Sequence, residues 1–89
     1  MKMSSQSYQY IENAFRQNSV NIQNHKDSLV RMKLEGKTKY NDLNTRLAWD
    51  VYHAFLPYDF QVYLSKNEDL NDSHIQTALF KALRELTII

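Results

Sequence analysis

The sequence predicts an all-α protein, a small helical bundle of four to five helices that occupies a single domain over residues 1–89. Three observations lead to this prediction. Apolar residues recur at steps of three and four over most of the chain, which is the period of an amphipathic helix. The chain has one glycine and one proline, and it contains no second strand-like segment with which a first could pair. Its 89 residues leave room for one hydrophobic core.

The composition excludes several classes of protein. Hydrophobic residues make up 43% of the chain and charged residues 24%, so we expect a folded domain and not a disordered one. Cysteine is absent, which rules out disulfides and thiolate metal sites. No apolar run reaches the length of a membrane span, and no apolar segment follows the first lysine as it would in a signal peptide. We therefore expect a cytoplasmic protein that does not contact a membrane.

Charge is balanced in total but unevenly placed along the chain. The formal net charge is +1, which predicts no strong general attraction to nucleic acid. Residues 26–46 carry six Lys or Arg against three Asp or Glu, whereas residues 50–72 carry five Asp or Glu against one Lys. These regions are either ordinary solvated faces or two complementary surfaces, used within a dimer or against a partner.

The N-terminal third has two possible helical readings. Residues 1–7 are polar and are expected to fray, whereas a seam of eight positions with alternating steps of three and four predicts one long helix. The asparagines around Asn24 are poor helix formers, so the alternative is a break between Asn24 and Asp27 and a second helix over 29–35. In both cases the single glycine, Gly36, ends the helix. The seam consists of Tyr8, Ile11, Phe15, Asn18, Ile22, His25, Leu29 and Met32.

This seam also predicts self-association. It offers more apolar positions than a core of this size needs, and its polar members Asn18 and His25 resemble the residues that fix the register of coiled coils. We therefore expect a homodimer that forms through the seam. In the alternative, the segment bends near Asn24 and packs its apolar stripe on the central helix of its own chain, which gives a monomer.

The central helix is predicted over residues 41–56. Asn41 is a suitable N-cap, Asp42 places a carboxylate in the first turn, and Pro57 ends the helix at the preceding residue. The apolar arc of this helix is too wide for one neighbour to cover, so more than one helix must pack on it. The predicted core consists of Leu43, Leu47, Val51, Phe55, Leu79, Leu83 and Phe15.

Two further elements follow the proline. Residues 58–65 alternate as a strand would but also fit a short helix, and we favour the helix because the chain offers no second strand. The last helix begins with Asn71 as its N-cap, or two residues later if Ser73 and Gln76 form a capping box. Its buried stripe is predicted to consist of Ile75, Ala78, Leu79, Ala82, Leu83 and Leu86.

The sequence shows no combination of residues that indicates catalysis. One glycine cannot build a phosphate-binding loop, and no serine stands in an activating context. The three histidines belong to different elements and form no closely spaced ligand pair. Asp50 and His53 share one helix face and are interpreted as structural, with metal or proton chemistry or pH sensing as alternatives. We expect no enzymatic activity, no cofactor and no bound metal.

A small helical chain of this kind is expected to act by binding another protein, as an adaptor, regulator or inhibitor. Accessory factors of phages and other mobile elements are one class of such proteins. Tyrosine and tryptophan dominate the hot spots of protein interfaces, and cations assist, so these residue types supply the candidates. The predicted contact residues are Tyr8, Tyr10, Lys33, Lys37, Lys39, Tyr40, Arg46, Tyr58 and Tyr63.

The alternative function is DNA binding by a helix-turn-helix over residues 29–55. In this reading a helix over 29–35 and a turn at Gly36 precede the central helix, which acts as the recognition helix. The low number of cations in the central helix and its apolar character argue against this alternative. The base-facing residues would be Asn41, Asn44, Thr45 and Arg46.

Overall fold

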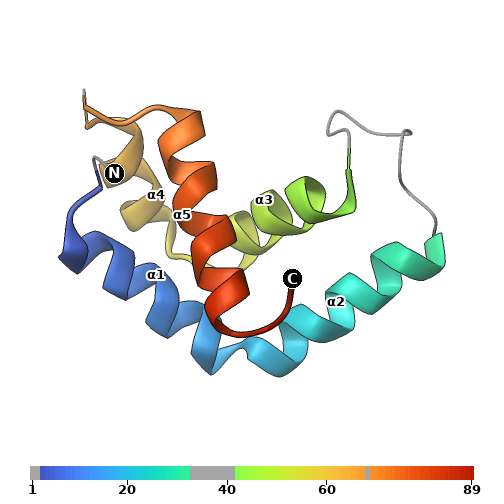
Figure 1. Ribbon diagram of the computed structural model, residues 1–89. Coiled ribbons are helices and arrows are strands. Elements are labelled where there is room, and N and C mark those ends of the chain that lie inside the picture. The colour runs from blue at the N-terminus through green and yellow to red at the C-terminus, as the bar shows by residue number, and fades with distance from the viewer. Residues whose placement is uncertain (1–2, 33–41, 68) are drawn as a thin grey trace.

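The computed structural model describes residues 3–32, 42–67 and 69–89 (Figure 1). In these residues the chain forms five α-helices and no strand, which confirms the predicted all-α bundle. The helices are α1 (Ser5–Gln17), α2 (Ser19–Met32), α3 (Leu43–Phe55), α4 (Tyr58–Ser65) and α5 (Asp72–Glu85).

The helices gather around α3, as its wide apolar arc requires. α3 contacts α1, α2 and α5, and α5 also packs on α1. Figure 1 shows α1 and α2 meeting end to end at an open angle, with α5 lying across α1 and α3. The prediction that more than one helix packs on the central helix is therefore confirmed.

Most of the predicted core is buried, but its two end positions are not. Leu43 and Phe55 are only half-buried and pack against the edge of the core, which corrects the prediction for both. They are the first and last residues of α3. The helix continues on only one side of each of these positions, so their side chains are less covered than those in the middle. The residues that are almost completely buried, as predicted, are Phe15, Leu47, Val51, Leu79 and Leu83.

The N-terminus is more ordered than its polar sequence suggests. Met3 is 5% exposed and belongs to the core, and α1 already begins at Ser5. The side chain of Ser4 caps α1 by accepting a hydrogen bond from the backbone N–H of Ser7 at 3.1 Å. The expectation that residues 1–7 fray is therefore wrong for residues 3–7, because one buried methionine and one serine cap hold this segment.

The helix break of the N-terminal third lies at Asn18. The structure shows neither one long helix nor a break between Asn24 and Asp27, since α2 is continuous across those residues. The side-chain amide of Asn18 donates to the carbonyl of Ala14 at 2.7 Å, and its own carbonyl accepts the first hydrogen bond of α2 from Ile22 at 2.9 Å. Asn24 is tolerated inside α2 because it faces solvent. The predicted end at Gly36 lies outside the described residues.

The predicted dimer seam is part of the core of a single chain. Tyr8, Ile11, Phe15, Ile22 and Leu29 are all buried within the chain, whereas Met32 is 62% exposed. The break at Asn18 makes this possible, because it turns the two halves of the seam toward one interior. The seam is thus not a free surface, and the apolar excess on which the dimer prediction rested is absent. Self-association by another surface stays a prediction.

The central helix begins and ends close to its predicted limits. Asp42 is the N-cap and accepts hydrogen bonds from Thr45, at 2.8 Å from the backbone N–H and 3.0 Å from the hydroxyl. The proposed cap Asn41 lies outside the described residues. Asp42, which is predicted to lie in the first turn, is instead the N-cap of α3. The helix ends at Phe55, and Leu56 is extended before Pro57 as expected.

The segment after Pro57 is a helix, which confirms the favoured reading of residues 58–65. Gln61 of α4 ties this short helix to the end of α3. Its side-chain amide donates to the carbonyls of Leu56 at 2.9 Å and Tyr52 at 3.3 Å. The bond to Leu56 satisfies a carbonyl just beyond α3, whereas the Tyr52 carbonyl also accepts the backbone N–H of Leu56 at 3.3 Å.

The last helix starts at the predicted cap. Asn71 accepts a hydrogen bond from the backbone of His74 at 3.0 Å, and His74 Nδ1 accepts one from the backbone of Asn71 at 3.2 Å. This reciprocal pair is a capping box in which histidine takes the usual place of Glu or Gln. The competing box of Ser73 and Gln76 is therefore not formed. Of the predicted stripe, Leu86 is half-buried and the other five residues are buried.

The C-terminal residues fold back on the bundle after a left-handed turn. Thr87 has φ 56°, and the backbone N–H groups of Thr87 and Ile88 donate to the carbonyls of Arg84 and Leu83 at 2.9 and 3.0 Å. This is the Schellman pattern that ends many helices. Ile88 is 4% exposed, and its carbonyl accepts a hydrogen bond from Lys26 Nζ of α2. The apolar C-terminus therefore docks on the core.

Candidate functional site

The structure separates the predicted contact residues into three groups. Tyr10, Tyr58 and Tyr63 are exposed, with 46%, 76% and 56% of their surface accessible. Tyr8 is buried, which corrects its assignment as a contact residue, and Arg46 is half-buried. The predicted contact residues that lie outside the described part of the chain are Lys33, Lys37, Lys39 and Tyr40.

Two of the exposed tyrosines belong to a continuous aromatic surface. The ring of Tyr10 in α1 stacks on Phe60 in α4, with 4.5 Å between the ring centroids and 22° between the planes. Phe60 in turn lies 6.2 Å from Tyr63, one turn further along α4. We call Tyr10, Phe60 and Tyr63 the aromatic strip. Phe60 is not among the predicted contact residues, although its position three residues before Tyr63 places both on one face of a helix.

Tyr8 faces the interior because it lies in register with Ile11 and Phe15, whereas Tyr10 does not. Its hydroxyl oxygen is buried and has no hydrogen-bond partner among the described residues. Lys81 Nζ lies 4.6 Å from the centroid of its ring. Burial raises the pKa of the Tyr8 hydroxyl, and the nearby carboxylates Glu12 and Glu85 act in the same direction. Tyr8 therefore joins α1 to α5 and offers no contact to a partner.

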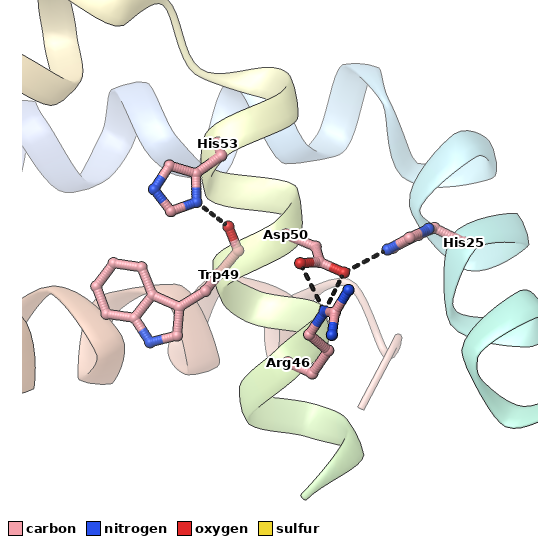
Figure 2. Close-up of polar contacts among 5 residues, drawn as sticks. All are labelled: His25, Arg46, Trp49, Asp50 and His53. Atoms are coloured by element: carbon pink, nitrogen blue, oxygen red, sulfur yellow. Dashed lines mark hydrogen bonds and ion pairs between the residues drawn. The ribbon is translucent and has the colours of Figure 1, made fainter. Parts of the chain in front are cut away.

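A second cluster of functional groups lies where α2 meets α3 (Figure 2). Arg46 Nε donates to both carboxylate oxygens of Asp50, at 2.9 and 2.8 Å. His25 Nε2 donates to Asp50 Oδ2 at 2.8 Å across the helix interface. His53 instead donates from Nδ1 to the backbone carbonyl of Trp49 at 2.8 Å. Asp50 and His53 thus share a helix face but do not pair with each other, because Asp50 binds Arg46 and His25 instead.

The sequence contained a signal for only one of these contacts. Arg46 and Asp50 are four residues apart, which is the spacing of an ion pair on a helix surface. His25 and Asp50 are 25 residues apart, and their contact follows from the packing of α2 on α3. No local pattern could reveal it.

The cluster borders a hollow of about 440 Å³ that combines these polar groups with an apolar floor of Val51, Ala54 and Phe55. Among the described residues that line it there is no Ser, Thr, Cys, Lys or Tyr that could act as a nucleophile beside the histidines. Within the described ranges, no three His, Cys, Asp or Glu side chains come close enough to hold a metal ion. The arrangement directly forms an ion pair within α3, between Arg46 and Asp50, and a hydrogen bond from His25 that joins α2 to this pair.

Similarity to known proteins does not narrow the range of possible functions. No helix in the part of the chain that the structure describes is long and apolar enough to cross a lipid bilayer. No protein-family model, curated protein or solved structure matches the chain.

Proposed function

We propose that this protein acts by binding another protein, as an adaptor, regulator or inhibitor, and that the aromatic strip is its contact surface. The observation behind the proposal is the stacking of exposed Tyr10 on Phe60 at 4.5 Å, with exposed Tyr63 beside it. A tyrosine ring provides a large contact area and a polar tip, and it loses little conformational entropy on binding. Rings that are already stacked lose less still.

The surroundings of Tyr10 also suit a protein interface. Gln6 and Asn13 lie one helical turn before and after Tyr10, and both are exposed. Amide side chains can hydrogen-bond a partner without the large desolvation cost of a charge. Charged residues are depleted from the centres of protein interfaces, and aromatic residues are enriched there. The face around Tyr10 has this composition.

DNA binding by a helix-turn-helix stays a prediction that the described residues do not favour. The N-terminal end of α3, which would have to approach the DNA, presents the exposed carboxylate of Asp42. The positive charge of Arg46 is already shared with Asp50. A phosphate would therefore meet a carboxylate at this end and compete with another for the arginine.

The proposal is tested by comparing two pairs of substitutions in the tagged full chain. Tyr10→Ala with Tyr63→Ala removes the outer rings of the strip. Val20→Ala with Val30→Ala removes apolar side chains of similar exposure, 73% and 53%, from α2. A specific partner identified by mass spectrometry should be retained by the wild type and the α2 variant and lost by the strip variant.

The affinity for the purified partner, measured by calorimetry, quantifies the effect. Loss of one hot-spot ring costs at least about 2 kcal/mol, which is about thirtyfold in the dissociation constant. Circular dichroism spectra equal to the wild type show that both variants are folded. Equal affinity of the strip variant and the wild type would refute the proposal.

A further inference from the structure

A second hollow, of about 760 Å³, lies between α3, α4 and the start of α5. Aromatic side chains line it, among them Trp49 and Tyr52 of α3 and Tyr58 of α4. The rings of Trp49 and Tyr52 stand nearly at right angles, with an interplanar angle of 80° and 5.3 Å between centroids. Figure 2 shows Trp49 on the other side of α3 from His25, and His53 lines both this hollow and the one beside the polar cluster.

The inner aromatic walls are held in place before any ligand arrives. Trp49 Nε1 donates to the side-chain oxygen of Gln76 in α5 at 3.0 Å, which fixes the indole. Tyr52 is 5% exposed and is therefore held by core packing. Tyr58 is 76% exposed and stands at the rim. A ligand would thus meet the fixed indole of Trp49 inside and the free ring of Tyr58 at the entrance, while the buried Tyr52 offers little surface to it.

The hollow is lined by one carboxylate and one imidazole, that of His53. Among the described residues that line it, Asp72 is the single carboxylate, and there is no Lys or Arg. Burial raises the pKa of the Tyr52 hydroxyl, and the charge of Asp72 raises it further. The Asp72 carboxylate therefore acts electrostatically on Tyr52, one of the aromatic side chains that line the hollow. An anion would be repelled here, whereas a cation would gain from both the carboxylate and the ring faces.

We propose that this hollow binds a cationic side chain, a lysine or arginine, of the protein partner. Aromatic faces attract ammonium and guanidinium groups, and the aliphatic stem of either side chain can lie along the apolar walls. A purely apolar side chain would leave the Asp72 charge without a partner. The inference rests on the proposed protein-binding function, but it concerns a different surface from the aromatic strip.

The test uses the full chain and three short peptides that differ at one central residue: lysine, arginine or norleucine. Norleucine keeps an aliphatic chain and removes the charge. Trp49 is the only tryptophan, so its indole N–H gives a single resonance in a ¹H–¹⁵N spectrum and reports on the hollow directly. We expect the lysine and arginine peptides to shift this resonance in a saturable way, and norleucine to bind at least about fivefold more weakly.

Three variants test the origin of the binding. Asp72→Asn and Tyr58→Ala should each weaken the lysine peptide by about fivefold, because one removes the carboxylate and the other a ring face. Asp69→Asn makes the same change of charge three residues away on a side chain that does not line the hollow, and it should leave the affinity unchanged. Tyr58 is exposed, so its loss cannot unfold the chain.

The outcomes separate this inference from the proposed function. Equal binding of the norleucine peptide, no saturable shift, or full affinity of Asp72→Asn would overturn the cation site. The variant Tyr10→Ala with Tyr63→Ala should bind the lysine peptide like the wild type. If that variant loses the partner while the peptides fail to bind, only the cation site is wrong. If it keeps the partner while the peptides bind, only the role of the aromatic strip is wrong.

Discussion

Two helices of equal length are held in this bundle by different means. α2 and α5 each have 14 residues, yet five residues of α5 are buried and only two of α2. α5 packs on both α3 and α1, whereas α2 lies along α3 and adjoins α1 at its start. The extent of packing on the neighbouring helices, and not helix length, therefore decides how much of each helix belongs to the core. The two buried residues of α2 are Ile22 and Leu29.

Polar contacts supplement the small apolar face of α2. His25 binds Asp50 of α3, and Lys26 donates to the carbonyl of Ile88 at the C-terminus. On its outer side α2 exposes Val20, which is 73% accessible. Exposed polar pairs contribute little each, so α2 should open at a lower free energy than α5.

The largest expected effect comes from truncating one buried leucine in each helix. Leu79 of α5 is 0% exposed and Leu29 of α2 is 2% exposed, so their burial is nearly the same. We expect Leu79→Ala to lower the free energy of unfolding by about 4 kcal/mol and Leu29→Ala by about 2 kcal/mol. Leu79→Ala leaves a cavity between α5 and the two helices on which it packs, α1 and α3. By contrast, α2 can shift to fill part of the cavity that Leu29→Ala leaves. Urea unfolding followed by circular dichroism measures both values.

Hydrogen exchange and a surface variant complete this comparison. Leu29→Ala should speed the exchange of α2 amides while those of α5 keep their protection. Val30→Ala, at a position 53% exposed on the same helix, should change stability by less than about 0.5 kcal/mol. Equal losses of stability at Leu29 and Leu79 would show that α2 is as much a part of the core as α5.

A smaller effect is expected from the polar link between α2 and α3. Asp50→Asn removes the charge that Arg46 and His25 share. Because about a quarter of the Asp50 side chain is exposed, 26%, solvent weakens the link, and we expect a loss of about 1 kcal/mol. The loss should shrink at high salt, which screens the wild-type pair.

The control for this change is Asp27→Asn. Asp27 makes its contact within α2, to Gln23 at 3.2 Å, so its loss leaves the helix interface intact. Both variants lower the negative charge by one. Urea titrations in low and high sodium chloride should therefore separate them. Equal salt dependence of the two variants would mean that the ion pair of Asp50 with Arg46 does not contribute to stability.

The sequence predicted the fold because its signals are local. The helical period identified the central and last helices, and the cap at Asn71 and the stop at Pro57 fixed their ends. The break in the N-terminal third was misplaced because residues near Asn24 and Asn18 have similar helix propensity. Packing decides between them: Ile22 and Leu29 are buried on either side of Asn24 within one helix, whereas α1 ends and α2 begins around Asn18.

The candidate sites were only partly predictable for the same reason. Residue type selected Tyr10, Tyr58 and Tyr63, which are exposed, and also Tyr8, which is buried. Tyr8 lies on the same helix face as Ile11 and Phe15, and this position in the apolar stripe could have identified it as a buried residue. The stacking of α1 on α4 at Phe60 and the contact of His25 with Asp50 depend on tertiary packing. No spacing along the chain contains that information.

The smallest effect concerns the turn through which α5 reaches α2. Thr87 adopts φ 56° there, and a β-branched residue in this left-handed region is strained. Glycine is free of that strain but loses more chain entropy on folding, so Thr87→Gly should raise the free energy of unfolding by about 0.5 kcal/mol. Thr77→Gly, the same change at an exposed position inside α5, should lower it by about 0.4 kcal/mol, because threonine is itself a poor helix former. Opposite signs in urea unfolding would show that the gain comes from the turn. Faster amide exchange in α2 of the Thr87→Gly variant would show that Thr87 restricts the C-terminal residues that Lys26 contacts. In that case the turn links the stability of α2 to that of α5.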